Sequence, residues 1–258
     1  VHGNFSLVAQ HLDATRLMAL FTHRPQLLPL YEKWLHRLAP AVRAQLFYHF
    51  QEGWRDSDGC LPPWLVALLP PTERQRQGRA HWHHHVLATR PTQRFPYASC
   101  LPWEEARAVL EPFIRNPDAE LRAAANAALA ATVRFERQRV GELLEFVLAR
   151  KNEQDPVRCA LLTALAALPP SVYRSEHLEA LGQVLRQALD ATDLSYDTAA
   201  AAQQLVVALL SRHPEWAVHW LATLVKERGR LSFGSLEHKL TDADVQRLAP
   251  ALLPVLQA

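Results

Sequence analysis

The chain has little of what marks several common protein classes. It holds only eight glycines, and no stretch has the GxxxxGK(S/T) or GxGxxG form of a phosphate-binding loop; Gly229 and Gly234, which come nearest, are predicted to lie in an ordinary loop. The three cysteines, Cys60, Cys100 and Cys159, are odd in number and far apart. They form neither a disulfide framework nor a CxxC site, which predicts a protein of the reducing cytoplasm.

Long apolar runs, a signal sequence and a strong net charge are missing as well. No stretch approaches the roughly 18 uninterrupted apolar residues that indicate a membrane-spanning helix. Residues 1–4 lack the basic and apolar regions of a signal peptide, and the missing initiator Met suggests a processed chain or a segment of a longer protein. The net charge of +2 is too close to neutral to predict a nucleic-acid partner by itself.

What the chain does have is the composition of a helical globular protein. Of its 258 residues 49% are hydrophobic and 21% are charged, and Ala and Leu are abundant. Strong helix formers with few glycines favour helices over sheet. The 18 prolines lie mostly between apolar-periodic runs, where they start or stop helices. The Ala-, Arg- and Leu-rich usage is typical of a high-GC bacterial genome. We therefore expect an all-α fold.

One apolar helix pattern recurs in the second half of the chain. Two stripes, 36 residues apart, have the same spacing: Leu121, Ala125, Ala128, Leu129 and Thr132, then Val157, Leu161, Ala164, Leu165 and Leu168. Further pairs of stripes follow, at 180–185 with 202–209 and at 220–225 with 245–256. A single helix pair has too little apolar surface to be stable alone, so neighbouring pairs must cover one another.

The first hundred residues fit this plan less well. Stripes at 28–38 and 42–50 predict two helices within residues 1–51. The period then fails over 52–101, a Pro-, Trp- and His-rich stretch. There we expect a short helix, a longer helix from about Thr72 to Ala88 with a capping box formed by Thr72 and Gln75, and loops. The expected organisation is one domain, 1–258, in which 52–101 is an irregular insertion before the repeats of 102–258.

Large aromatic residues also recur at helical spacing in the first part of the chain. We expect most of them to lie in the core, because large apolar residues at this spacing normally pack inside. Any that remained exposed along one ridge would instead mark a groove for a partner. They are Phe5, Phe21, Tyr31, Trp34, Phe47, Tyr48, Phe50 and Trp54.

Two turns carry a more specific signal. The sequences NPDAELRAAA from Asn116 and DPVRCAL from Asp155, and more faintly PAVRA from Pro40, resemble the second-helix motif of HEAT repeats. The strong match covers roughly residues 102–168. The resemblance implies a right-handed α-α superhelix (a HEAT-like solenoid) of about five or six helix pairs. It also implies a protein that holds other macromolecules along its concave surface.

The charged residues of this motif have a direct physical explanation. Asp118 can cap the following helix and complement its dipole. Arg122 can pair with Asp118 at i,i+4, and Arg158 with Asp155 at i,i+3. Either arginine could instead reach the acid of the neighbouring repeat, which gives the ladder that HEAT proteins often show. We therefore expect structural roles for Asp118, Arg122, Asp155 and Arg158.

A histidine cluster is the most conspicuous candidate for a metal site. His81, His84 and His85 would share one face of a helix, with His83 on another face. Two imidazoles at i,i+4 can bind Zn²⁺, but a third ligand is not evident and no HExxH motif is present. The alternative is a polar helix face that gains charge below about pH 6.5. No cofactor is predicted.

Five arginines in the same stretch mix with aromatic residues, as surfaces that bind phosphates and stack bases do. They are Arg74, Arg76, Arg79, Arg90 and Arg94, with Trp82, Phe95, Tyr97 and Trp103 nearby. The alternative is a solvated helix face above buried aromatic side chains. Glu73 and the nearly neutral chain weigh against a nucleic-acid site.

Evidence for catalysis is weak throughout. There is no GxSxG motif, and no histidine can be placed beside Cys100 from the sequence. A minority of HEAT-like folds are DNA alkylpurine glycosylases, which need an acid in an aromatic cleft. Two acidic groups lie near aromatic residues, but aspartate also favours turns. These are Asp56 and Asp58 near Trp54, and Asp193 and Asp197 near Tyr196.

These observations predict a non-enzymatic, cytoplasmic scaffold that binds protein. The second helices would supply its concave face, so Arg122, Asn126, Arg158 and Thr163 are expected to be exposed contact residues. The alternative is a nucleic-acid binder, including a base-repair enzyme, in which the basic residues would converge on one cleft with an acid at its base.

Overall fold

The computed structural model describes residues 13–23, 35 and 38–228, together with positions 242, 246, 249, 250 and 253. Every regular element within these residues is helical, which confirms the helical fold class. The chain divides into two compact units, Val1–Leu101 and Pro102–Ala258, and each is described by itself. In the described part of the chain, no helix has the length and apolar character needed to cross a bilayer.

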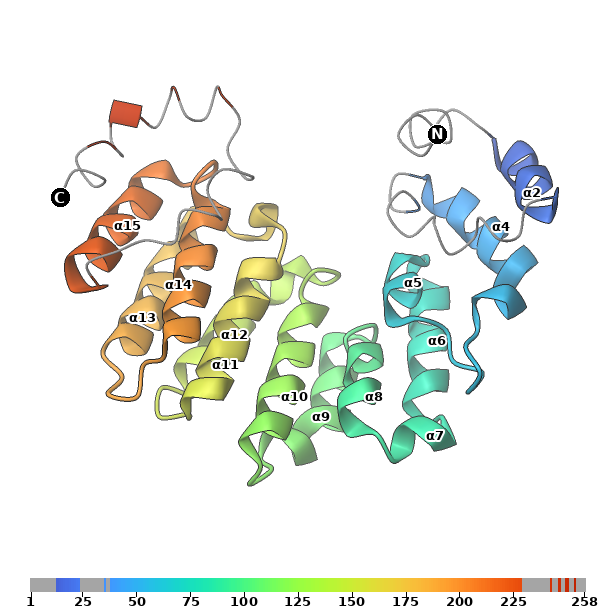
Figure 1. Ribbon diagram of the computed structural model, residues 1–258, viewed down its shortest axis with the longest axis horizontal. Helices are drawn as coiled ribbons and strands as arrows, with labels where there is room; N and C mark the ends of the chain where they lie inside the picture. Colours follow the sequence, from blue (N-terminus) through green and yellow to red (C-terminus); the bar gives the residue numbers. More distant parts are fainter. Residues whose placement is uncertain are drawn as a thin grey trace. The chain divides into compact units, whose positions relative to one another are not determined.

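The first unit contains six α-helices of very different length among its described residues (Figure 1). They are α2 (Ala14–His23), α4 (Pro40–Phe50), α5 (Pro63–Leu68), α6 (Pro71–Trp82), α7 (His85–Ala88) and α8 (Pro91–Ala98), with a 3₁₀ turn at Gln51–Trp54. Pro63, Pro71 and Pro91 each stand at the start of a helix, where the missing N–H costs no hydrogen bond. Helix α4 packs on α2, and α6 packs on both α5 and α8.

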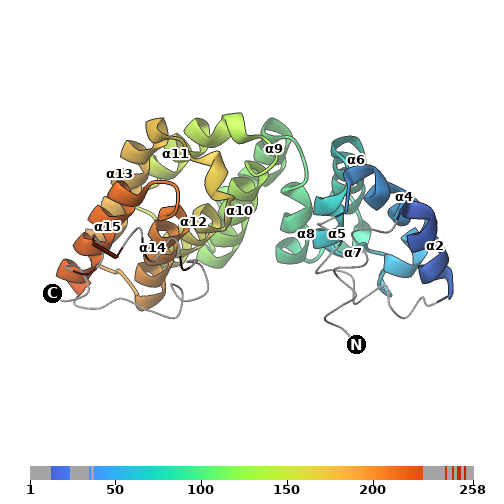
Figure 2. The same ribbon diagram turned by 90° about the horizontal axis from the view of Figure 1, so that it is seen from above.

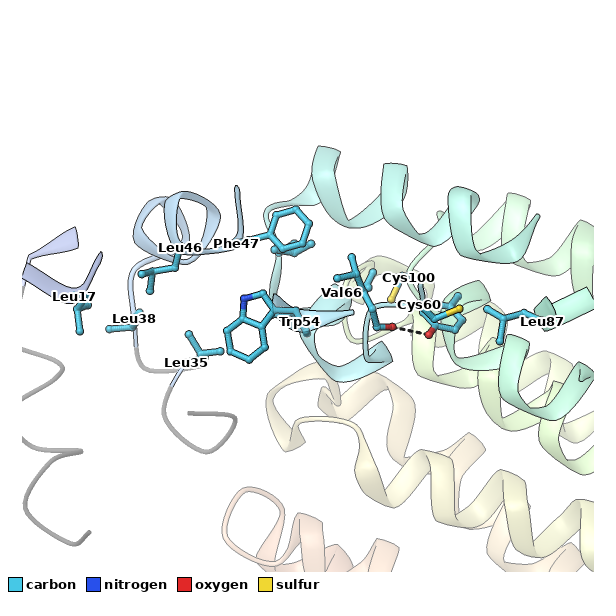
Figure 3. Close-up of a cluster of buried hydrophobic side chains, with 14 residues drawn as sticks. Leu17, Leu35, Leu38, Leu46, Phe47, Trp54, Cys60, Val66, Leu87 and Cys100 are labelled. Atoms are coloured by element: carbon cyan, nitrogen blue, oxygen red, sulfur yellow. Dashed lines mark hydrogen bonds between the residues drawn. The ribbon is translucent and has the colours of Figure 1, made fainter. Parts of the chain in front are cut away.

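The core of this unit lies around Phe47, Trp54 and Val66, with the thiols of Cys60 and Cys100 buried among them (Figure 3). The Tyr97 hydroxyl donates a 2.6 Å hydrogen bond to the Leu61 carbonyl. Of the predicted aromatic core, Phe47 and Trp54 are buried and Phe50 is partly buried, but Tyr48 is 52% exposed. Phe5, Tyr31, Trp34 and the side chain of Phe21 lie outside the described residues.

The long helix predicted from Thr72 to Ala88 is wrong. Helix α6 ends at Trp82, and His84 has extended backbone angles before the short α7 begins. Histidine has a low helix propensity, so the run of three gives little local preference for continuing the helix. Thr72 is not a cap either, because α6 begins at Pro71 and has no side-chain cap. Helix α8 occupies a stretch predicted as loops.

The second unit is built from successive helix pairs in two layers. Its helices are α9 (Trp103–Ile114), α10 (Ala119–Thr132), α11 (Val140–Leu148), α12 (Asp155–Ala167), α13 (Leu178–Leu189), α14 (Tyr196–Leu209) and α15 (Pro214–Arg228), with 3₁₀ turns at Arg137–Arg139, Pro170–Val172 and Ser175–His177. Figures 1 and 2 show α10, α12 and α14 side by side in one layer, with α9, α11 and α13 in the other. Helix α12 packs on both α10 and α14.

The apolar stripes predicted from the repeat form the core of this unit. Leu129, Leu165 and Leu205, one from each second helix, are fully buried, as is Leu185 of α13. Small residues let these helices approach closely; Ala125 in α10 is fully buried, and its side chain is only a methyl group. In the fourth pair Trp220, Leu221 and Leu224 are buried.

Several other predicted positions fall outside the described residues. They are the 28–34 part of the first N-terminal stripe, the loop at 229–234 and most of the stripe at 245–256. From the last of these Leu253 is described, and it is 52% exposed, which does not fit its predicted place in the core.

Candidate functional site

Two arginines of the repeat motif join successive turns of the second unit. The Arg122 guanidinium donates to the carbonyl oxygens of Asn116 (2.8 Å) and Pro117 (2.9 Å) in its own turn. It also donates to Glu153 and to Gln154, at 3.2 Å each, in the α11–α12 turn. The side chain is only 14% exposed. Arg122 therefore fixes two turns to each other.

Arg158 repeats this arrangement one helix pair further along the chain. It bonds the Glu153 carbonyl and Asp155 in its own turn, and it forms an ion pair with Asp193 in the α13–α14 turn. Asp155 in turn accepts the backbone N–H of Ser195 at 3.1 Å. Burial alone would raise the pKa of Asp155, but hydrogen bonds from Ser195 and Thr198 and the charge of Arg158 hold it below its usual value.

The predicted ladder is thus present, but its partners differ in part from those expected. Asp118 caps α10, where its carboxylate accepts the N–H groups of Glu120 (2.9 Å) and Leu121 (3.4 Å). Because its carboxylate faces the end of the helix, it forms no ion pair with Arg122 among the described contacts. Arg122 reaches Glu153 and not an aspartate, whereas Arg158 makes both its local and its neighbour contact.

Two of the four expected contact residues are not exposed. Asn126 has no exposed surface and Arg158 is buried, while Arg122 is largely covered and Thr163 is exposed. The reason is that the second helices pack on one another, α12 on both α10 and α14, so less of their surface faces solvent. At positions corresponding to Thr163, Ala127 on α10 is partly exposed and Gln204 on α14 is exposed, and both are uncharged.

A groove of about 580 Å³ lies between the α9–α10 turn and the α11–α12 turn. We call it the turn-edge groove. Its polar lining comes from Arg115, Asn116, Arg122, Arg150, Asn152 and Glu153. Three of these six side chains are arginines, and Glu153 is already bonded to one of them. The volume is within the range of sites that hold small ligands or short peptide segments.

Arg150 is the most unusual cation of this groove. Its guanidinium carbon lies 3.4 Å from the ring centroid of Phe146, and its Nη1 donates to the Phe146 carbonyl at 2.9 Å. No carboxylate of the described residues lies within 4 Å of its nitrogens. Burial lowers the pKa of Arg150; the charges of Glu153 and Glu111 oppose this shift, and those of Arg107 and Arg115 add to it. Arg115, 79% exposed, pairs with Glu111 at 2.6 Å.

The histidine cluster does not fit a metal site. His81 is buried; its Nδ1 lies 2.8 Å from the Gln77 carbonyl and its Nε2 accepts the Leu61 N–H at 2.9 Å, so both ring nitrogens are occupied. His84 precedes the next helix and His85 begins it, so neither shares a helix face with His81, although the ring centroids of His81 and His84 lie 6.4 Å apart. Within the described residues, no three potential ligands come together.

Sequence reasoning missed a contact between His84 and a cysteine. The Cys60 sulfur lies 3.6 Å from His84 Nδ1. Burial, and then the charges of Asp56 and Asp58, raise the pKa of the Cys60 thiol. A raised pKa keeps the thiol protonated, which is the opposite of what a nucleophile needs. The pair therefore has the character of a buried structural contact.

The five arginines of the predicted basic cluster have separate roles. Arg74 is buried in α6, whereas Arg79 is exposed on the same helix. Arg76 pairs with Glu73 at 2.6 Å, Arg90 with Asp58 at 3.0 Å, and Arg94 stacks 4.0 Å over Trp82. Glu73 also accepts from Tyr48 and Gln77. Arg76, Arg90 and Arg94 are thus each held by another side chain.

The acidic residues considered for a glycosylase site act locally. Asp56 accepts the N–H groups of Asp58 (3.0 Å) and Cys60 (2.8 Å), which forms a tight turn around Gly59. Gly59 has φ 76°, a conformation that favours glycine. Asp193 belongs to the arginine ladder, and Tyr196 and Asp197 are exposed at the start of α14.

A second groove, of about 540 Å³, lies between α13 and α15 and was not predicted from the sequence. Trp216 and Trp220 line it, with ring centroids 6.2 Å apart. A Cβ at Gly182 would stand 3.2 Å from Trp220, so this glycine makes room for the indole. Trp216 Nε1 donates to the Leu178 carbonyl at 3.0 Å.

Comparison of the chain with protein-family models, with curated proteins and with solved structures gives no match in any of the three. The described residues define an all-helical protein. Its function has to be argued from its own residues.

Proposed function

We propose that the second unit is a HEAT-like α-solenoid segment that acts as a non-enzymatic scaffold for another protein. The observation that carries this proposal is the serial packing of α10, α12 and α14, in which the middle helix contacts both neighbours. Such an arrangement gives an extended layer and no central cavity, and extended layers suit the binding of a long partner surface.

The arginine ladder supports the same proposal. Arg122 and Arg158 each bond the turn that follows, so the spacing between successive pairs is held by charged hydrogen bonds as well as by apolar packing. A layer with fixed spacing presents its exposed residues in a regular row. A regular row is useful for binding and has no evident role in catalysis.

The middle of the second-helix layer exposes few reactive groups. Thr163 and Gln204 are exposed and Ala127 is partly exposed, and they bring no charge and no nucleophile beyond one hydroxyl; the exposed acids Glu120 and Asp197 lie near the helix starts. Small uncharged side chains let a partner backbone approach closely. The three cysteines are free, which supports a site of action in the reducing cytoplasm. The separate roles of the first unit's arginines give the nucleic-acid alternative no particular support.

Photo-crosslinking of the full chain tests this proposal. Thr163 is replaced by p-benzoyl-phenylalanine, and the protein is irradiated in an extract of its source cells. The matched control carries the same amino acid at Glu145, which is exposed on α11 in the other layer. We expect discrete protein adducts from Thr163 that are absent from Glu145. Identical adducts from both positions, or none from Thr163, would contradict the proposal.

A further inference from the structure

We propose that the turn-edge groove binds an acidic segment of the partner protein, with Arg115 and Arg150 receiving its carboxylates. This inference rests on the proposed scaffold function and adds the chemistry of one contact. The juxtaposition that supports it is a groove whose walls are two successive turns and whose cations outnumber its acids.

Arg150 supplies the strongest argument. Its guanidinium carbon lies 3.4 Å from the ring centroid of Phe146, and one nitrogen is bonded to the Phe146 carbonyl. These contacts restrict the guanidinium before any partner arrives, and a guanidinium can bind a carboxylate through two parallel hydrogen bonds. A half-buried cation that forms no ion pair among the described residues gains more from an incoming carboxylate than an exposed cation does.

The groove is also held open in a fixed shape. Arg122 bonds both of its walls, through Asn116 and Pro117 on one side and Glu153 and Gln154 on the other. The walls therefore need little rearrangement when a segment binds, which lowers the entropy cost of association. Arg122 is a positioning residue here, because four of its five N–H donors are already used.

An acidic peptide fits this site better than a nucleic acid does. Nucleic-acid backbones are bound by a series of cations that follow successive phosphates, and aromatic faces stack the bases. Here the cations are confined to one groove, and Glu111 and Glu153 stand beside them. The face of Phe146 is already covered by Arg150. This arrangement suits separate carboxylate groups that are each bound by one arginine.

Fluorescence anisotropy with the full chain tests the inference. The probe is a fluorescein-labelled peptide, Gly-Glu-Glu-Gly-Glu-Glu, and its Gln counterpart is the uncharged control. We expect the Glu peptide to bind, and the double variant Arg115→Gln, Arg150→Gln to weaken binding at least about tenfold, the size of losing one or two charged hydrogen bonds. Arg137→Gln removes one exposed cation at the α10–α11 turn, at the opposite end of the helix pair, and should leave binding unchanged.

Further variants and a second probe complete the test. If the double variant fails to fold, Arg115→Gln alone remains informative, because this side chain is 79% exposed and its removal should not unfold the protein. Equal weakening by Arg137→Gln, or tighter binding of a labelled dodecathymidine than of the Glu peptide, overturns the inference. If the Glu peptide does not bind but Thr163 gives specific adducts, the groove proposal is overturned and the scaffold proposal stands. If the Glu peptide binds but Thr163 gives no such adducts, the scaffold proposal is overturned and the acidic-peptide site stands.

Discussion

The two units of the chain are stabilised in different ways. In the second unit one pattern recurs: an arginine about one turn into a second helix bonds the turn that follows, in α10 and again in α12. In the first unit each contact occurs once, as in the hydrogen bonds from Tyr97 and Leu61 and the close approach at Gly78. A repeated contact can be found in the sequence as a period, whereas a unique contact leaves no such trace.

The comparison also predicts different responses to mutation. In a serial array, damage to one contact should spread mainly to its neighbours. In a unit that depends on unique contacts, a substitution at a single close approach should change the stability as much as removing a whole side chain does elsewhere. Four tests, which change single residues or the pH, can support or contradict this contrast.

The largest effect is expected from removing the buried ladder arginine. Arg158→Met leaves Asp155 and the Glu153 carbonyl without their charged partner in a site that is only about one-tenth to one-fifth exposed. We expect a loss of about 2–3 kcal/mol, near the lower end for breaking a buried pair because Asp193 stays half exposed. Urea denaturation measures it. The control is Arg186→Met, whose ion pairs with Asp190 and Glu227 are exposed and should be worth about 0–1 kcal/mol.

The next largest effect on stability is expected at two glycines, one in each unit, where replacement by alanine should have opposite signs. A Cβ at Gly78 would lie 3.1 Å from the Tyr97 carbonyl oxygen and 3.2 Å from Cys100 Cβ, whereas a Cβ at Gly141 meets nothing within 4 Å. Gly78→Ala should destabilise the protein by about 1–2 kcal/mol through overpacking. Gly141→Ala should stabilise it by about 0.5–1 kcal/mol through helix propensity. Thermal melts decide the signs, and two changes of the same sign would refute the argument.

The third effect is a dependence on pH that comes from His81. Burial lowers its pKa, although its bond to the Gln77 carbonyl and Asp56 oppose the shift; Arg55 and His84 add to it, and Tyr97 stacks on the ring. Because the folded-state pKa lies below the unfolded value of about 6.5, its contribution is complete above that pH. It is lost as the pH falls from there through the folded pKa, when a proton on Nε2 displaces the Leu61 N–H.

Urea denaturation between pH 7.5 and 5.5 checks this behaviour. The wild type and the control His85→Gln, in which an exposed histidine is removed, should lose stability in parallel over this interval. His81→Gln should show a flatter dependence. The remaining slope would come from groups common to all three proteins, such as His177, whose pKa burial also lowers. An unchanged slope in His81→Gln would exclude His81 as the cause.

The smallest effect tests one irregular position inside the repeat. Asn126 is fully buried; its Nδ2 donates to the Arg122 carbonyl, but its Oδ1 has no partner. The corresponding residue in the next repeat is Leu162, 1% exposed. Asn126→Leu should therefore stabilise the protein by about 1 kcal/mol, because a buried unpaired acceptor is removed. The reverse change, Leu162→Asn, should destabilise it. Calorimetry would contradict this if Asn126→Leu lowered the melting temperature.

The sequence was sufficient for the features that repeat. The stripes that contain Leu129 and Leu165 predict the core of the second unit, and Asp118 is recognisable as a cap from its turn. It was insufficient where a contact joins residues without a period. Asn126 and Arg158 were expected to be exposed because spacing alone does not show that each second helix is covered by the next one.

The grooves could not be predicted for a related reason. The turn-edge groove needs Arg115 and Arg150 to meet across two turns, and the second groove needs Gly182 to accommodate Trp220. Neither pair is connected by a motif or a helical period. The His81 environment is similar, since its partner Leu61 lies 20 residues away in an irregular segment.

Serial stacking of the second unit is the claim on which the proposals depend, and hydrogen–deuterium exchange of Arg158→Met against the wild type tests it most directly. The substitution lies between the second and third helix pairs. The account predicts a graded loss of protection, largest in α12 and α14 and smaller in α10. An equal loss of protection in all helices from α9 to α15 would indicate one cooperative globule and contradict it.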